Sequence, residues 1–261
     1  MRIAHRMSAL LLTIGAASTL AAAQTASPIA SVTLSPSRVT GGATVTGIVT
    51  LTSEAGDGGV QVRLESNKTS LATLPDDRVV IQAGTRTASF VVQTKPVAGN
   101  PNAVTDPPSV DITAMRWLPG SGPANPPRPL PPPMTVRLTV LPAALASLTV
   151  SPSSVPGGTA ATGQVQLTGL AVAPGLTIAL ASKLTGNEPS RRTIQPGVGQ
   201  SGPASVPTQV TIPAGASSAT FQITTRQVTA ATPVQITASY GAFGMKSALL
   251  TITPLSKGGN P

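Results

Sequence analysis

Apolar and polar residues alternate along most of the chain after residue 30, and the apolar ones do not recur at helical spacing. A step of two positions places one row of side chains inward and the other outward on a half-buried strand. Thr and Ser fill most outward positions, as suits a solvated sheet face. The pattern predicts seven strands in the first half, over residues 31–35, 44–52, 59–66, 78–82, 87–94, 109–116 and 134–141.

The pattern is repeated later in the chain. Residues 29–52 match residues 145–168 at a constant offset of 116. After a segment of different length the register resumes at an offset of 131, which aligns Phe90 with Phe221 at inward positions. The sequence therefore predicts a duplicated unit, with one copy over residues 24–142 and the other over residues 143–261.

The fold class follows from strand number and spacing. The 25 Gly and 27 Pro residues punctuate the strands and leave no long stretch with a helical period. About seven short strands in each copy of roughly 115 residues are typical of two packed antiparallel sheets in Greek-key order. We therefore expect an all-β protein made of two tandem Ig-like β-sandwiches.

Two segments interrupt the correspondence between the copies. Copy two carries a 15-residue insertion, assigned to Leu184–Val206, where copy one has Ala-Thr-Leu-Pro at residues 72–75. Copy one carries a proline-rich stretch from Leu118 to Pro133, between its last two strands. Consecutive prolines favour an extended polyproline II rod, which here is either a stiff, solvated connection or a protruding recognition loop.

Several sequence motifs occur in copy one and recur, in part, in copy two. They are Ser-Val-Thr-Leu-Ser-Pro-Ser-x-Val-x-Gly-Gly, Thr-Gly-x-Val-x-Leu-Thr and Ile-x-Ala-Gly-Thr-x-Thr-Ala-Ser-Phe. With them the chain resembles the bacterial Ig-like (Big-type) repeat modules of envelope and secreted proteins. The resemblance covers nearly all of the chain after residue 23, twice, and implies a spacer, an adhesin segment or an accessory domain. These motifs are specific for the fold and not for a ligand.

The N-terminal segment has the three-part layout of a secretory signal peptide. A basic run over residues 1–6 precedes an apolar run over residues 7–20, and the small residues 21–23 follow. The apolar run is shorter than the roughly 20 residues that a membrane-spanning helix needs. We expect cleavage after Ala23 and a secreted or periplasmic mature chain without a membrane span.

Composition argues against catalysis. The chain has no Cys, and its one histidine, His5, lies in the predicted signal peptide. The mature chain then lacks Ser-His-Asp and Cys-His nucleophilic systems and the usual zinc and copper ligand sets. Asp76 and Asp77 are adjacent, so in a strand they point to opposite faces and cannot form a glycosidase pair. We expect no enzyme activity and no cofactor.

The remaining acids of copy one do not suggest a metal site either. They show no calcium-loop spacing, and copy two keeps only Glu188 as an acid. The interpretation as solvated turn and edge acids is therefore preferred over a calcium site. The aspartates considered are Asp57, Asp76, Asp77, Asp106 and Asp111.

The charge balance narrows the class of partner. The formal net charge is +9, and loss of Arg2 and Arg6 with the signal peptide lowers it to +7. The basic residues are scattered, and only five aromatic residues exist to stack on bases, so nucleic acid is not expected. The partner that we expect is therefore an unknown protein or a cell-envelope polymer.

A candidate interaction surface centres on Trp117, the single tryptophan. Strict alternation places Arg116 inward and Trp117 outward, where the indole is either a ligand platform or packs against the proline-rich stretch. Tyr240 and Phe243 occupy a comparable strand end in copy two. The full candidate set is Arg116, Trp117, Pro119, Arg128, Tyr240, Phe243, Arg191 and Arg192.

Three function classes stay open at this point. The leading one is a non-catalytic extracytoplasmic Ig-like protein with a structural or adhesive role. The second is a soluble module that binds glycans or small ligands, which needs an aromatic-lined surface. The third is a periplasmic assembly or chaperone-like subunit that adds an edge strand to a partner.

Overall fold

The computed structural model describes residues 28–99, 107–118, 126–185, 202–241 and 244–255. These residues form strands and loops, which confirms the predicted all-β class. Within this part of the chain no helix has the length and apolar character needed to span a bilayer. The predicted signal peptide lies outside the described residues.

The first nine strands form two sheets. A four-stranded sheet has the order β1-β3-β7-β5, and a five-stranded sheet has the order β2-β9-β8-β4-β6. Neighbouring strands are antiparallel, except that β2 runs parallel to β9. The bounds are β1 Ile29–Ser35, β2 Arg38–Thr40, β3 Thr44–Leu51, β4 Val60–Ser66, β5 Ala72–Thr73, β6 Arg78–Ile81, β7 Thr87–Thr94, β8 Ser109–Leu118 and β9 Arg128–Leu141.

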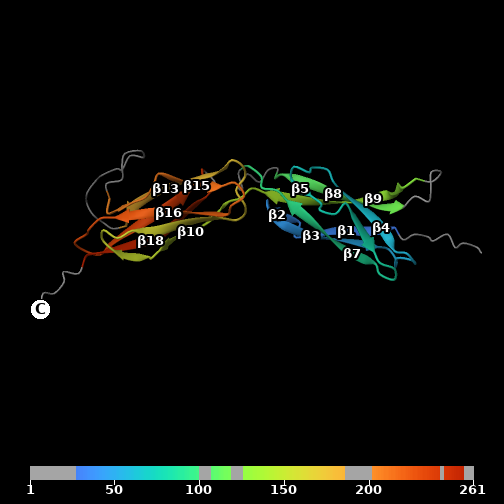
Figure 1. The fold of residues 1–261 in the computed structure, drawn as a ribbon, viewed down its shortest axis with the longest axis horizontal. Coiled ribbons are helices and arrows are strands. Elements are labelled where there is room, and N and C mark those ends of the chain that lie inside the picture. The colour runs from blue at the N-terminus through green and yellow to red at the C-terminus, as the bar shows by residue number, and fades with distance from the viewer. Residues whose placement is uncertain (1–27, 100–106, 119–125, 186–201, 242–243, 256–261) are drawn as a thin grey trace, which may run out of the picture.

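The next nine strands repeat this arrangement strand for strand, with the orders β10-β12-β16-β14 and β11-β18-β17-β13-β15. The two pairs of sheets lie end to end along the long axis of the molecule (Figure 1). The bounds are β10 Leu145–Ser151, β11 Ser154–Pro156, β12 Ala161–Leu167, β13 Gly175–Leu184, β14 Ala204–Ser205, β15 Gln209–Pro213, β16 Ser218–Thr225, β17 Thr232–Ser239 and β18 Met245–Thr253.

Each pair of sheets encloses one hydrophobic core, built from the inward rows that the alternation predicts. In the first pair, Val45 of one sheet and Ile112 of the other are both 0% exposed. In the second pair, Ile223 and Ile236 are likewise 0% exposed. The core is therefore the space between the two sheets, and the outward rows of both sheets face away from it.

The assignment of the copy-two insertion was wrong at its C-terminal end. Ala204–Ser205 form β14, which pairs with β16 as β5 pairs with β7. Ser66 Oγ donates to the Ala72 carbonyl at 2.8 Å, and Ser182 Oγ donates to the Ala204 carbonyl at 3.0 Å. Copy two thus keeps the motif, as Ala-Ser-Val-Pro at residues 204–207, and residues 186–201 of the insertion lie outside the described residues. A two-residue strand is too short for alternation to reveal it.

The prediction that the proline-rich stretch is a loop up to Pro133 was also wrong. Residues 128–133 belong to β9, where Trp117 of β8 pairs with Pro129. Because β2 pairs only with residues 139–141 of β9, this part of β9 is an edge of the sheet. At an edge, alternate N–H groups face away from the neighbouring strand, so a proline there removes no ladder hydrogen bond. The consecutive prolines 131–133 lie at a register shift between the pairs Leu130–Arg116 and Met134–Ala114, where the ladder with β8 is interrupted.

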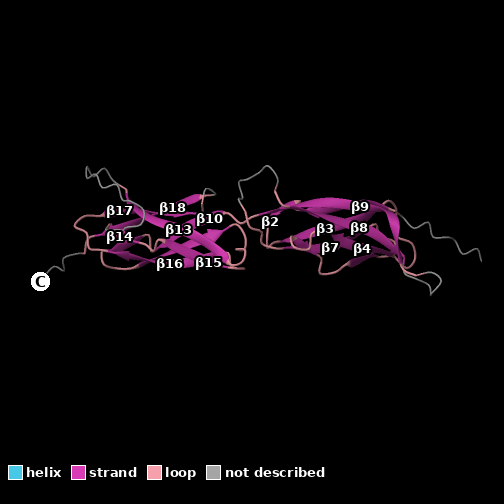
Figure 2. Cartoon of the chain, turned by 90° about the horizontal axis from the view of Figure 1, so that it is seen from above, coloured by secondary structure: helices cyan, strands magenta, loops and turns pink. Residues whose placement is uncertain are grey.

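A short connection joins the two pairs of sheets (Figure 2). β9 ends at Leu141 and β10 begins at Leu145, with Pro142 and Ala143 buried between them. Gly169, in the loop after β12, lies against Thr40 at the end of β2. The two pairs of sheets are thus in contact through loop residues as well as joined by the chain.

Candidate functional site

The register of β8 decides which way Arg116 and Trp117 point. Arg116 lies opposite Val62, which is 0% exposed, whereas Trp117 lies opposite Gln61 on the outward row. Arg116 is therefore on the inward row, as the alternation predicts, and burial lowers the pKa of its guanidinium. Arginine is so strong a base that it stays charged at neutral pH.

Two guanidinium groups lie against the indole of Trp117. The Arg63 Cζ atom is 5.1 Å from the ring centroid, and the Arg78 Cζ atom is 5.5 Å from it. Arg63 and Arg78 are directly opposite one another across β4 and β6. Attraction between a cation and the π face contributes about 0.5–1 kcal/mol at an exposed site. Trp117, Arg63 and Arg78 are called the Arg–Trp cluster below.

Two carboxylates accompany the cluster. Arg63 Nε lies 3.2 Å from Glu65 Oε1, and Arg78 Nε lies 4.0 Å from Asp77 Oδ1. The Arg63 and Arg78 side chains are 37% and 53% exposed, so water screens both ion pairs and each contributes little to stability. Both ion pairs use Nε, and each guanidinium carries four further N–H donors on its terminal nitrogens.

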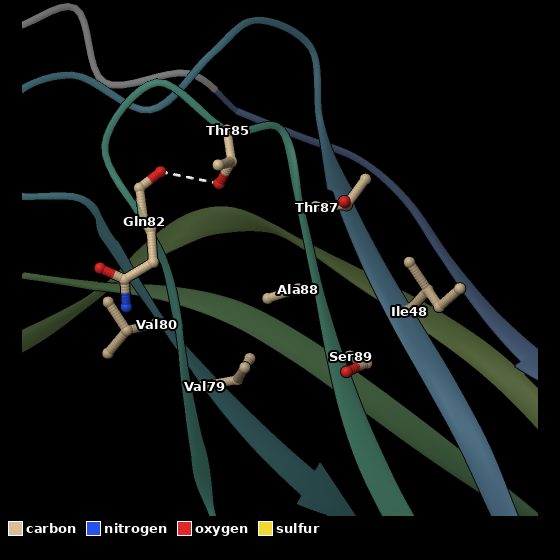
Figure 3. Close-up of a pocket in the computed structure, with 8 residues that line it drawn as sticks. All are labelled: Ile48, Val79, Val80, Gln82, Thr85, Thr87, Ala88 and Ser89. Atoms are coloured by element: carbon tan, nitrogen blue, oxygen red, sulfur yellow. Dashed lines mark hydrogen bonds between the residues drawn. The ribbon is translucent and has the colours of Figure 1, made fainter.

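A shallow groove lies beside the cluster, between the edge strand β6 of one sheet and β7 of the other (Figure 3). Its volume is about 490 Å³. Val80 of its lining is outward on β6, two positions from Arg78, so the groove adjoins the Arg–Trp cluster. The lining residues are Ile48, Val79, Val80, Gln82, Thr85, Thr87, Ala88 and Ser89.

Two exposed apolar side chains, Ile48 and Val80, line this groove, and a third, Val91, is on the outward row of β7 two positions after Ser89. Ile48 is 42% exposed, and Val80 and Val91 are each 44% exposed. Large apolar side chains gathered at a surface mark contact sites more often than scattered single ones do. Ile48, Val80 and Val91 are called the apolar triad below.

The second pair of sheets has neither feature at corresponding positions. The cross-strand pair Arg63 and Arg78 corresponds to Ala179 and Gln209. β17 ends at Ser239, opposite Ala179, so that this strand does not extend to a position equivalent to that of Trp117. The apolar triad corresponds to Gln164, Thr211 and Gln222.

The structure gathers only part of the predicted interaction surface. Arg128, at the start of β9, pairs with Leu118 next to Trp117 and Pro129. The Tyr240 N–H donates to the Gly244 carbonyl at 3.0 Å, and Gly244 lies beside Leu145, where β10 begins. β9 separates the two places by about 40 Å, at roughly 3.3 Å per residue. Pro119, Phe243, Arg191 and Arg192 lie outside the described residues.

Arg63 and Arg78 were missing from the predicted surface. Alternation around Val62 and Leu64 marks Arg63 as outward, but nothing in the sequence marks its neighbour across the sheet. Their meeting on Trp117 depends on the registers of β4 with β6 and of β4 with β8. A pattern along one strand does not fix the register between strands.

The described acidic residues of the first half form no cluster that could hold a metal ion, and Asp106 lies outside the described residues. Asp111 accepts a hydrogen bond from Arg137 Nε at 2.9 Å and one from Asn67 Nδ2 at 3.3 Å. Among the described residues no three His, Cys, Asp or Glu side chains are placed to hold a metal ion. Asp111 acts here as the partner of a basic residue on the neighbouring strand.

No family model and no curated protein matches the sequence. Among solved structures, a glycosyl hydrolase family 2 member from Bacteroides cellulosilyticus is 12% identical, with a TM-score of 0.29. That match covers 82% of this chain and 23% of the hydrolase. Murine CEACAM1b is 12% identical with a TM-score of 0.22, over 86% of this chain and 98% of that one. At these TM-scores neither likeness carries an argument about this chain.

Proposed function

We propose that this chain is a non-catalytic extracytoplasmic protein of two tandem Ig-like β-sandwiches, with an adhesive or structural role. The repeated strand order and the two separate cores support the tandem arrangement. The predicted signal peptide supports export. In this proposal the first half makes the contact with a surface partner, and the second half is a spacer.

One observation carries the proposal: the two halves share their strand order and core positions but differ in the residues on their outward faces. Strand order and inward rows correspond, while the outward rows around β4, β6 and β7 differ. The first half has the Arg–Trp cluster and the apolar triad there, and the second half has small or polar residues. Trp117 and Arg63 are half-buried, whereas Arg78 and the three aliphatic side chains are exposed, and none of them belongs to the hydrophobic core. A contact surface is therefore the simplest reason for their presence.

The experiment replaces these outward residues of the first half by their second-half counterparts and leaves the core residues unchanged. The mature chain, residues 24–261, is immobilised and exposed to cell-envelope material from the native host. We expect it to retain material that a five-substitution variant does not retain. That variant, called the exchange variant below, carries Ile48→Gln, Arg63→Ala, Arg78→Gln, Val80→Thr and Val91→Gln, which are the second-half residues at these positions.

A matched control separates a specific surface from bulk charge. Lys183→Gln with Lys246→Gln removes two positive charges from exposed positions of the second half, as the exchange variant removes two from the first. We expect this control to retain envelope material as the native chain does. Equal retention by the native chain and the exchange variant would exclude the exchanged residues of the first half as the contact surface.

A further inference from the structure

We propose that the Arg–Trp cluster binds carboxylate groups of a linear acidic polysaccharide, with Arg63 and Arg78 as the ligands of the carboxylate. The inference rests on the proposed function, because it names the partner class of the same surface. It uses the outward face of the five-stranded sheet and not the groove at its edge.

The indole holds both guanidinium groups ready for an anion. A free arginine side chain samples many rotamers, and fixing it on binding costs conformational entropy. Here Arg63 and Arg78 already lie 5.1 and 5.5 Å from the Trp117 ring centroid. A guanidinium near a π face keeps its N–H donors in its own plane, where a carboxylate can bind.

The placement of the two arginines also favours an anion between them. Like charges directly opposite one another across two strands repel, and Arg63 and Arg78 form such a pair. Among the described residues, Glu65 and Asp77 compensate this repulsion, and each lies on the Nε side of its arginine, at 3.2 and 4.0 Å. A ligand carboxylate that accepts from the terminal nitrogens of both arginines would relieve it further. The planar carboxylate suits this geometry, because two parallel N–H···O bonds can form with one guanidinium.

The surroundings of the cluster suit a sugar polymer better than a peptide. Gln61 lies opposite Trp117, and Thr113 on the outward row of β8 shares a hydrogen bond with the Thr135 hydroxyl at 3.0 Å, so an amide and a pair of hydroxyl groups line the same face of the sheet. The exposed apolar side chains Ile48 and Val80 line the groove at the edge instead. A bound peptide strand draws its specificity from pockets for alternate side chains, which the groove, and not the cluster face, offers.

The single tryptophan makes the test specific for this site. Trp117 is the only tryptophan in the chain, so its emission reports an anion that enters the cluster. The mature chain is titrated with sodium polygalacturonate and, separately, with fully methyl-esterified polygalacturonate, which has the same backbone without the charge. We expect saturable changes in emission with the first polymer and none with the second. Equal responses to both polymers would overturn the proposal.

Variants locate the binding, with calorimetry as a second readout because the arginines themselves affect the emission of Trp117. Arg63→Ala with Arg78→Gln should weaken polygalacturonate binding at least tenfold. Glu65→Gln should strengthen it severalfold, because it removes a competing carboxylate. Ile48→Gln with Val80→Thr and Val91→Gln should leave the affinity unchanged. Unaltered affinity in the double arginine variant would contradict the proposal.

Two further polymers test the ligand class. Dextran sulfate stays charged in acid, whereas sugar carboxyl groups protonate near pH 4, so polygalacturonate binding should weaken as the pH falls through about 4 and be lost well below it. Tighter binding of dextran sulfate, or of poly-L-glutamate, than of polygalacturonate would overturn the assignment to a carboxylated polysaccharide. If polygalacturonate fails to bind while the exchange variant still loses envelope material, this inference falls and the proposed function stands. If the native chain retains no envelope material, the proposed function falls.

Discussion

Gly47 lies directly beneath the ring of Phe90, its cross-strand partner between β3 and β7. A Cβ atom on Gly47 would overlap the end of the Phe90 ring. Gly163 and Phe221 repeat the relationship between β12 and β16. The aromatic ring fills the space that a side chain would take and covers the glycine backbone, so that each core depends on the glycine and the phenylalanine together.

Substitution of Gly47 by alanine should destabilise the first half. The added methyl group forces the Phe90 ring to move in a close-packed core, and such overpacking costs about 1–3 kcal/mol. The measurement is urea unfolding followed by the emission of Trp117, which lies in the first half and reports that half alone. Gly163→Ala should instead shift the unfolding of the second half, seen by far-UV circular dichroism, and leave the Trp117 transition in place.

A second variant separates the overlap with the Phe90 ring from a general effect of alanine on the strand. In a Phe90→Leu background the smaller side chain leaves room, so Gly47→Ala should cost less than in the native chain. The coupling between neighbours in contact is about 0.5–3 kcal/mol. An equal cost of Gly47→Ala in both backgrounds would show that the ring is not the reason.

The hydrogen bonds of Ser66 and Ser182 should contribute equally to the two halves. Ser66→Ala removes the bond to the Ala72 carbonyl, and Ser182→Ala removes the bond to the Ala204 carbonyl. Each should lower the free energy of unfolding of its own half by about 1 kcal/mol, since the carbonyl loses its donor. The exposed Ser89, substituted by alanine, is the control and should change stability by less than about 0.5 kcal/mol. An effect of Ser66→Ala no larger than that of the control would contradict this role.

The sequence predicted most strands and both cores because apolar and polar residues alternate along a half-buried strand. Val60, Val62 and Leu64 alternate with Gln61 and Arg63, and β4 follows from that pattern alone. The alternation did not predict β5 and β14, because a strand of two residues is too short to show an alternating pattern. Residues 128–133 of β9 were not predicted as strand, because prolines indicate a loop unless the segment is known to lie at a sheet edge.

The candidate site was harder to predict than the strands and the cores. Alternation placed Trp117 outward, and register confirms that position opposite Gln61. Its contacts with Arg63 and Arg78 cross three strands, and they depend on two registers that alternation leaves open. Tyr240 looked equivalent to Trp117 because it ends the corresponding strand, but it lies where β10 begins and packs against the second core.

Asp111 should make the stability of the first half depend on pH in acid. The hydrogen bond from Arg137 holds the pKa of Asp111 below its ordinary value of 3.8. A carboxyl group with a lowered pKa in the folded state stabilises that state above the ordinary pKa, and this contribution is lost as the pH falls through the lowered pKa. Asp111→Asn should therefore reduce the stability of the first half at neutral pH and flatten its decline below about pH 4.

The measurement for Asp111 is the urea midpoint of the Trp117 transition at a series of pH values from neutral to strongly acidic. Asp76→Asn, at an exposed loop position, is the matched control, because it removes one carboxyl group from the same half. We expect the control to keep the acid dependence of the native chain. If Asp111→Asn and the native chain lose stability in parallel as the pH falls, the Arg137 hydrogen bond does not control this titration.

Gly169→Ala should loosen the contact between the two pairs of sheets without harming either core. A Cβ atom on Gly169 would overlap Thr40 Cγ2 and lie 3.1 Å from the Gly41 carbonyl oxygen. Spin labels placed in the two halves should then give a broader distance distribution by double electron–electron resonance, while both unfolding transitions stay unchanged. Thr40→Ser removes Cγ2 and should largely restore the narrow distribution. Gly202→Ala, whose Cβ would meet its nearest neighbour at 3.6 Å, is the control for a new methyl group. A distribution equally broad with and without Thr40→Ser would show that Gly169 and Thr40 do not set the contact.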